Sequence, residues 1–348
     1  ALARSTDLKP KQKCDAKFDR RKDRKEDISF DVVIEICKRC LPDSLNENFF
    51  DFYNATKIKA SKETVLVFVQ YPDAFYEDRL FLNAYRYANG KKVFYQQHGC
   101  AYDSNPIFCH FHQIEFEKTG FISWGWTLSA YCKKLGQPLP MPLVKRSGNS
   151  DGGIMYVTKG SRPEKTLFVG DLRPASYSSR DQKRRKNFLG NLSSDTRLRI
   201  VQRPQQTQYD IAKAIELRDL GFIGAICEKK VYKFHKLLKS SSLVFLDHYG
   251  TTFYFCLAWN IPVICHWTKF PLLNFSYEET LEEFSNVGIV HYSAFEAANF
   301  YNKLTSIDDW WTSSEVQSVR RNFTSKYFLN NRFWLRKWTD FIKLQYEN

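Results

Sequence analysis

The sequence predicts an α/β fold of two Rossmann-like domains that face each other across a cleft. Three observations support this prediction. Short, wholly apolar runs such as residues 243–246 are typical of parallel strands buried on both faces. Stretches with helical spacing alternate with these runs in both halves of the chain. Between residues 136 and 165, proline, glycine and serine dominate, which indicates an interdomain connection.

The composition divides the 348 residues into five parts. Residues 1–27 are charged and almost free of aliphatic side chains, which predicts a basic tail or a surface helix. We expect an N-terminal Rossmann-like domain over residues 28–140, a linker over 141–165 and a C-terminal Rossmann-like domain over 166–310. Two aromatic-rich helices are expected to close the chain over 311–348.

Individual elements follow from apolar runs, helical spacing and the glycines and prolines that separate them. In the N-terminal half we expect strands at residues 64–70, 92–96 and 120–126, and helices at 28–41, 78–89 and 114–118. In the C-terminal half we expect strands at residues 166–169, 198–201, 221–226, 243–246, 263–265 and 288–290. The helices there are expected at 180–189, 253–259, 294–304, 314–328 and 332–344, and one more is expected to end near residue 238.

Residues 240–267 form the clearest β-α-β unit. A polar turn at 247–250 follows the apolar strand, and Thr251 and Thr252 stand at a natural helix start. Two hydroxyl groups and free backbone N–H groups at a helix N-terminus suit a phosphate. An ordinary threonine N-cap without a ligand accounts for the same pattern.

Charge and cysteine content limit the classes of partner. Lys and Arg number 52 against 38 Asp and Glu, a net charge of +14, so nucleic acid, an acidic membrane surface or an anionic substrate are candidate partners. Nine cysteines lack the framework of a small secreted protein, and reduced thiols in a cytosolic protein are the simpler interpretation. The sequence shows neither a signal peptide nor a long apolar span.

Several common motifs are missing from the sequence. It contains no G-x-G-x-x-G fingerprint, Walker loop or G-x-S-x-G elbow, which counts against a dehydrogenase, a P-loop NTPase and an α/β hydrolase. Cys37 and Cys40 form a single C-x-x-C pair on an expected helix, where packing explains them better than zinc. We therefore expect no metal site.

Two polar segments of the N-terminal half are candidates for the cleft. His98 follows the strand at 92–96 and precedes Gly99, so it suits a hydrogen-bonding role toward a ligand, or is satisfied by local partners. Glu115 and Glu117 lie on opposite faces of an expected helix. One of them could act as a general acid or base, and either is equally well explained as surface.

Three charged residues follow strands in the C-terminal half. Asp171 is placed for a base or a covalent nucleophile, or for turn formation. Arg173 would keep that carboxylate ionised if the two approached each other. Arg203, before Pro204, suits a phosphate or carboxylate, or is an ordinary surface arginine.

The last expected helix carries Trp334, Trp338 and Phe341 on one face. That face could dock on an anionic membrane surface. We favour the alternative that it packs back on the first domain.

Four motifs together resemble a known family. They are Gln97-His98-Gly99 with Tyr102, the run 123–126 (Ser-Trp-Gly-Trp), the turn and helix start at 247–252, and 260–262 (Asn-Ile-Pro). Over residues 41–290 they resemble a bacterial transferase family of O-antigen and capsule loci, similar to GT-B glycosyltransferases that include retaining β-Kdo transferases (Kdo is 3-deoxy-manno-octulosonic acid). The chain departs from it at Asp103, where the family has glycine, and in the short segment before Gln97, which leaves acceptor specificity open.

The resemblance implies a GT-B-like, cytoplasmic glycosyltransferase that works at the inner membrane face. Its best donor is CMP-β-Kdo, bound by the second domain, and its acceptor is a surface polysaccharide or lipopolysaccharide, as an oligosaccharide or lipid-linked glycan. We expect no cofactor and a metal-independent reaction, because no Asp-x-Asp element is present.

The resemblance also implies roles for individual residues. The donor-phosphate site would comprise Arg203, Asp247, His248, Tyr249, Gly250, Thr251 and Thr252. The catalytic candidates are His98, Glu115, Glu117 and Asp171, the last as nucleophile in a retaining reaction. Gln97, Gly99, Tyr102 and Arg173 would line the cleft.

Two alternatives stay open. A CDP-glycerol-type glycerophosphotransferase would use the same scaffold with another donor. A non-enzymatic nucleic-acid-binding protein is motivated by the charge alone, and since no nucleic-acid module is recognisable we expect no nucleic-acid partner.

Overall fold

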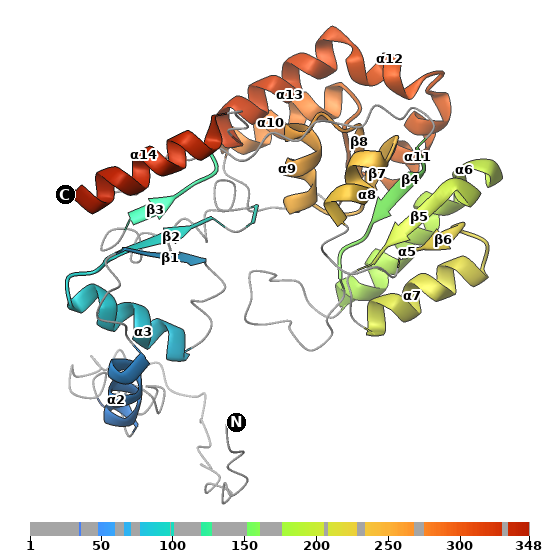
Figure 1. Cartoon of the computed structure of the whole chain (residues 1–348). Helices are drawn as coiled ribbons and strands as arrows, with labels where there is room; N and C mark the ends of the chain where they lie inside the picture. The colour runs from blue at the N-terminus through green and yellow to red at the C-terminus, as the bar shows by residue number, and fades with distance from the viewer. Residues whose placement is uncertain are drawn as a thin grey trace, which may run out of the picture. The chain divides into compact units, whose positions relative to one another are not determined.

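The computed structural model is shown in Figure 1. It describes residues 35, 48–59, 66–70, 77–97, 99–100, 120–126, 152–160, 176–204, 208–227, 234–267, 275–328 and 333–347. The chain divides into two compact units, Ala1–Phe52 and Tyr53–Asn348. Apart from the first residues of helix α2 (Phe49–Lys59), every feature below belongs to the second unit.

The first sheet contains β1 (Leu66–Gln70), β2 (Lys92–Gln96) and β3 (Gly120–Ile122) in the order β1-β2-β3, with parallel pairing throughout. Helix α3 (Glu77–Ala88) connects the first two strands. It is followed by Gly90, whose φ of 73° places it in the left-handed region that glycine adopts readily.

The second sheet has the strand order of a Rossmann fold. Its strands β4 (Ile154–Val157), β5 (Ile200–Arg203), β6 (Ala225–Ile226), β7 (Leu243–Leu246), β8 (Val263–His266) and β9 (Val290–His291) are arranged β6-β5-β4-β7-β8-β9. Every neighbouring pair is parallel. In chain order this is 3-2-1-4-5-6, the doubly wound order in which ligands bind beyond the carboxyl ends of strands 1 and 4, here β4 and β7.

Helices cover both faces of this sheet. The helices of this part of the chain are α5 (Ser176–Gly190), α6 (Ser194–Arg199), α7 (Gln208–Asp219), α8 (Phe234–Ser240), α9 (Thr251–Ala258), α10 (Phe275–Asn286), α11 (Ala294–Lys303), α12 (Ile307–Thr312) and α13 (Ser314–Tyr327). The last helix, α14 (Trp334–Glu347), packs on the first sheet. Val244 and Leu246 pack with α9, α10 and α13, whereas Leu243 and Phe245 pack with α5 and α11. This alternation explains why β7 is apolar at every position.

The α/β class and the parallel sheets predicted from the sequence are confirmed. The expected strands at 92–96 and 243–246 coincide with β2 and β7. The expected strand at 198–201 begins later, because α6 extends to Arg199 and Leu198 is 71% exposed. The expected strand at 166–169 lies outside the described residues.

Strand β4 corrects the expected linker over 141–165. Residues Ile154–Val157 are all buried and form a central strand of the second sheet. The short apolar run was hidden by the glycines, prolines and serines on both sides of it, which dominate any composition window. The domain boundaries themselves stay a prediction.

The closing helix packs on the first sheet, as we favoured. Phe341 of α14 is buried against Ile122 of β3, with Phe94 and Trp338 beside it. Lys92 Nζ donates a hydrogen bond to the main-chain oxygen of Gln345 (2.6 Å). Phe341 of this face is therefore covered by the first sheet. Among the described residues, no helix is long and apolar enough to cross a bilayer.

Candidate functional site

The candidate site lies at the carboxyl ends of β4 and β7. Asp247 and His248 follow β7, and Lys159 follows β4. These strands are neighbours and the chain leaves them in opposite directions, so this is the switch point at which Rossmann-type sheets bind ligands.

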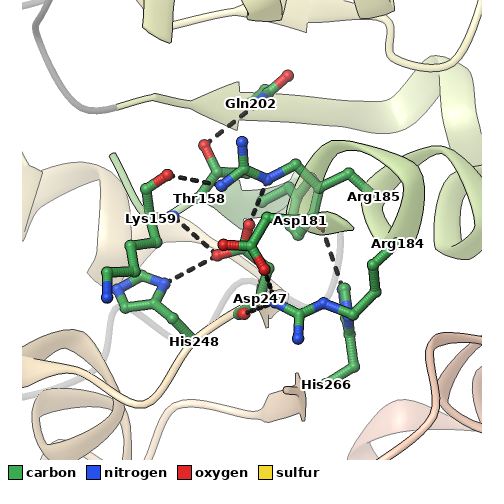
Figure 2. Close-up of polar contacts among 10 residues, drawn as sticks. Thr158, Lys159, Asp181, Arg184, Arg185, Gln202, Asp247, His248 and His266 are labelled. Atoms are coloured by element: carbon green, nitrogen blue, oxygen red, sulfur yellow. Dashed lines mark hydrogen bonds and ion pairs between the residues drawn. The ribbon is translucent and has the colours of Figure 1, made fainter. Parts of the chain in front are cut away.

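Asp247 is the centre of the polar network in Figure 2. Its buried carboxylate accepts hydrogen bonds at Oδ1 from the Lys159 main-chain N–H (2.7 Å) and from His248 Nδ1 (2.9 Å). Oδ2 is ion-paired with Arg185 Nε. Arg184 donates to the main-chain oxygen of Asp247 (2.8 Å), and Arg185 also donates to that of Lys159 (2.6 Å). The network joins β4, α5 and β7.

Asp247 is an ionised anchor residue. Burial alone would raise the pKa of its carboxyl group, but the charge of Arg185 and the contacts with His248 outweigh burial and hold the pKa well below its ordinary value. Burial likewise opposes the charge of Arg185, yet Asp247 raises the pKa of this guanidinium overall. Since protein groups contact both carboxylate oxygens, Asp247 orients the groups around it.

The contact with Asp247 fixes the tautomer of His248. An ionised carboxylate only accepts hydrogen bonds, so Nδ1 of His248 carries the proton and Nε2 is left for other partners. The ring lies directly against Gly250, where an added Cβ would approach Cδ2 and Nε2 to 2.8 Å. Glycine at this position is required by the close approach of the imidazole.

Helix α9 begins without a side-chain cap. Its N-cap is Gly250, in an extended conformation, and Thr251 and Thr252 are the first two helical residues. The alternative of a plain threonine N-cap is therefore wrong. The Thr251 hydroxyl instead accepts a long hydrogen bond from the Cys100 N–H (3.4 Å), and a Cβ on Gly99 would lie 3.1 Å from it.

Gln97 connects two of the sequence motifs. Its Oε1 accepts hydrogen bonds from the Trp124 main-chain N–H (2.9 Å) and from Trp126 Nε1 (2.8 Å), and its Nε2 donates to Gly99 O (2.8 Å). The buried amide thus holds Gly99 where it meets Thr251. This places Gln97 as a positioning residue behind the segment that meets α9.

Two other expected phosphate ligands have partners within the protein. Arg203, at the end of β5, donates to the main-chain oxygen of Pro204 (2.7 Å) and lies over the Phe234 ring, 5.3 Å from its centroid. The Tyr249 hydroxyl is hydrogen-bonded to that of Tyr254. Tyr249 therefore belongs to the packing of α9.

Residues 3–342 match the LIC12162 family transferase. The chain belongs to this family. The family is one of transferases. This agrees with the transferase family that the motifs around Gln97 and Asp247 resemble. A comparison with curated proteins finds no match.

Solved structures show only distant similarity. One, assigned as a UDP-N-acetylglucosamine 2-epimerase from Listeria monocytogenes, is 11% identical over 85% of this chain and 79% of that chain, with a TM-score of 0.49. The wall teichoic acid polymerase TagF is 12% identical over 90% of this chain and 96% of that chain, with a TM-score of 0.46. A structure of accessory secretory proteins 1, 2 and 3 in Streptococcus pneumoniae is 10% identical over 87% of this chain and 58% of that chain, with a TM-score of 0.42. At these scores no functional conclusion follows for the LIC12162 family chain.

The structure brings together part of the predicted site. Asp247, His248, Gly250, Thr251 and Thr252 surround the start of α9, and Gln97 and Gly99 contact it from the first sheet. Outside the described residues lie His98, Tyr102, Glu115, Glu117, Asp171 and Arg173. Within the described ranges, no group of three His, Cys, Asp or Glu residues is placed to hold a metal ion.

Sequence reasoning missed Lys159, Arg184 and Arg185. Lys159 fell in the expected linker, and the two arginines lie in the helix expected at 180–189. Helical spacing is the signal that could have found Arg185, because it lies three and four residues before the buried Phe188 and Leu189, on the same face of the helix.

Proposed function

We propose that this member of the LIC12162 family is a glycosyltransferase that moves a sugar from a nucleotide-sugar donor onto a surface-polysaccharide or lipopolysaccharide acceptor. The observation that carries the proposal is the set of polar groups at the β4–β7 switch point, where His248, Thr251 and Thr252 surround the start of α9. Hydroxyl groups and N–H groups at this point of a Rossmann-type sheet suit a nucleotide phosphate.

The donor that the sequence motifs favour is CMP-β-Kdo, and the acceptor is an oligosaccharide or lipid-linked glycan at the cytoplasmic face of the inner membrane. In this proposal the second sheet binds the donor, in the manner of GT-B enzymes. Donors fixed on a helix terminus would stabilise the departing phosphate without a metal ion. His98, Glu115, Glu117 and Asp171 remain the catalytic candidates, with Arg173 and Tyr102 beside them.

The test is a transfer assay with purified protein, a lipopolysaccharide or capsule acceptor, and a donor panel of CMP-Kdo, UDP-sugars and CDP-glycerol. We expect Thr251→Val to lower kcat/KM by about tenfold or more, because it removes the hydroxyl group and keeps the shape. Thr251→Ser should recover most of the activity. Thr312→Val, on α12 and bonded only to Asp308 O, is the matched control.

Full activity in Thr251→Val would contradict the phosphate role of this residue. Turnover of CDP-glycerol, with none of the nucleotide sugars, would replace the proposal with the glycerophosphotransferase alternative. No transfer from any donor, with salt-sensitive binding to random RNA instead, would favour the nucleic-acid binder.

A further inference from the structure

The imidazole of His248 is held in one orientation through Nδ1, and its other nitrogen, Nε2, is open to a ligand. Its side chain is 16% exposed, and its Nδ1 is held by the ionised Asp247. Nowhere in the described part of the chain does a protein group hydrogen-bond to Nε2. Because the tautomer is fixed, Nε2 accepts a hydrogen bond when the ring is neutral and donates one when the ring is protonated.

The charges around His248 favour an anion next to it. Lys159 and His248 both donate to Oδ1 of Asp247, so they are neighbours, and Figure 2 shows the contacts of the Lys159 main chain and of the imidazole with Asp247. Arg184 and Arg185 approach from α5. Asp247 is neutralised by Arg185, and Asp181 forms an ion pair with Arg184 (3.0 Å). A protonated His248 would then add a positive charge next to this ion-paired network at the end of β7.

We propose that His248 binds the phosphate group of a nucleotide through protonated Nε2, so that nucleotide binding is coupled to the uptake of a proton. This inference rests on the proposed function, because it takes the nucleotide of the donor as the ligand. Asp247 acts as the positioning residue that orients the ring. A charge-assisted hydrogen bond to phosphate is short and stronger than a neutral one.

Two substitutions separate the two ring nitrogens. His248→Asn places an amide N–H near the position of Nδ1, which keeps the contact with Asp247 but removes Nε2. His248→Gln places its amide near Nε2 but cannot take up a proton. His291→Gln, on the edge strand β9 with Nε2 bonded to Gly288 O, is the matched control away from β7. Thermal unfolding of each variant shows whether the fold is retained.

The probes are CMP and UDP, titrated by calorimetry at about pH 5.5 and about pH 8.5, on either side of the ordinary histidine pKa. The terminal phosphate of CMP and UDP also titrates, at about pH 6, so each variant is compared with the wild type for the same nucleotide. For the wild type we expect affinity at the lower pH about tenfold above that of His248→Asn, and at an intermediate pH an enthalpy that varies more with the ionisation enthalpy of the buffer than in either His248 variant. His248→Gln should bind with intermediate affinity. His291→Gln should behave as wild type.

The outcomes distinguish this inference from the proposed function. Nucleotide binding whose affinity at the lower pH and whose buffer dependence are unchanged in a folded His248→Asn overturns the role of His248 and leaves the glycosyltransferase proposal intact. Loss of both properties in His291→Gln, but not in His248→Asn, would also overturn it. Absence of binding by both CMP and UDP contradicts the proposed function itself, and with it this inference.

Discussion

Asp247 lies out of contact with solvent and receives hydrogen bonds from the segment after β4, from α5 and from His248. A buried ion pair adds little net stability, because the cost of removing both charges from water offsets their attraction. The loss of one partner lowers stability strongly, because the other charge is then left buried and uncompensated. The pair therefore determines the geometry of the site more than the overall stability.

We expect Arg185→Met or Asp247→Leu alone to lower the free energy of unfolding by about 3–5 kcal/mol, because each leaves one buried charge. The double variant should recover part of this loss, since neither charge remains. Urea denaturation at neutral pH measures all three. Additive losses in the double variant would show that the two side chains do not depend on each other. Because the pKa of Asp247 is lowered in the fold, the contribution of the pair is present above about pH 4 and is lost as the pH falls further.

His266 on β8 supplies a second pH dependence. Burial lowers the pKa of its imidazole to about 3, so the ring is neutral in the fold, stacked on Phe188 and bonded to the Tyr156 hydroxyl. The unfolded chain binds this proton near pH 6.5, so stability should fall as the pH drops from about 6.5 toward 3, by several kcal/mol at the lower end. His266→Phe should unfold at lower temperature at neutral pH but show a flatter decline in Tm between about pH 6.5 and pH 4.5. An unchanged decline would contradict the assignment.

At this scale the sequence predicted the polar turn after β7 but not the contacts that support it. The apolar run 243–246 followed by the polar turn at 247–250 predicted where a ligand would meet the sheet, because strand ends are visible as changes in polarity. That Asp247 is buried depends on Arg185, 62 residues away in the chain. Such a pairing is a property of the folded packing, and no local pattern reports it.

Among the elements, α14 shows the contrast between a packed face and an exposed one. Phe341 is 5% exposed and packs on Ile122 and Phe94, whereas its neighbour Ile342 is 39% exposed. Apolar spacing predicted a buried face for this helix, packed on the first domain, but not the residues that it contacts, because β2 and β3 are far away in the sequence.

We expect Phe341→Ala to lower the free energy of unfolding by about 3 kcal/mol and to expose α14 to limited proteolysis, since a buried aromatic ring is lost from the contact with β3. Ile342→Ala, one residue further along the same helix, should change stability by about 0.5 kcal/mol or less. Equal effects of the two substitutions would show that α14 is not held by this face.

Strand β4 marks the limit of prediction at the scale of elements. Its four residues are apolar, but a run this short, between glycine-rich and proline-rich segments, has no period that separates it from a loop. Its identity as the central strand depends on its pairing with β5 and β7, which comes from distant parts of the chain. The longer alternation of strands and helices was still sufficient to predict the parallel class.

At the scale of the whole unit Tyr53–Asn348, the two sheets are connected through side chains near the site. Trp124, just after β3, is buried among Tyr254, Phe255 and Phe328, and so belongs to the core of the second sheet. Gly99 and Cys100 meet Thr251 at the start of the same helix. Gln97, Gly99, Trp124 and Thr251, which belong to motifs that resembled one family from the sequence, thus lie on one contact surface in the fold.

If this surface joins the two sheets energetically, its loss should uncouple their unfolding. We expect the wild type to unfold in one cooperative step and Trp124→Ala to unfold in two, with a smaller urea m-value for each, because each step exposes less surface. Trp126→Ala removes an equally buried ring, which contacts Phe121 of β3 and Gln97, the residue after β2. These contacts lie at the first sheet. It should lower stability without splitting the transition. Tryptophan fluorescence and far-ultraviolet circular dichroism, followed on the same samples, decide between the two outcomes. Coincident curves in Trp124→Ala would show that the contact with α9 does not couple the sheets.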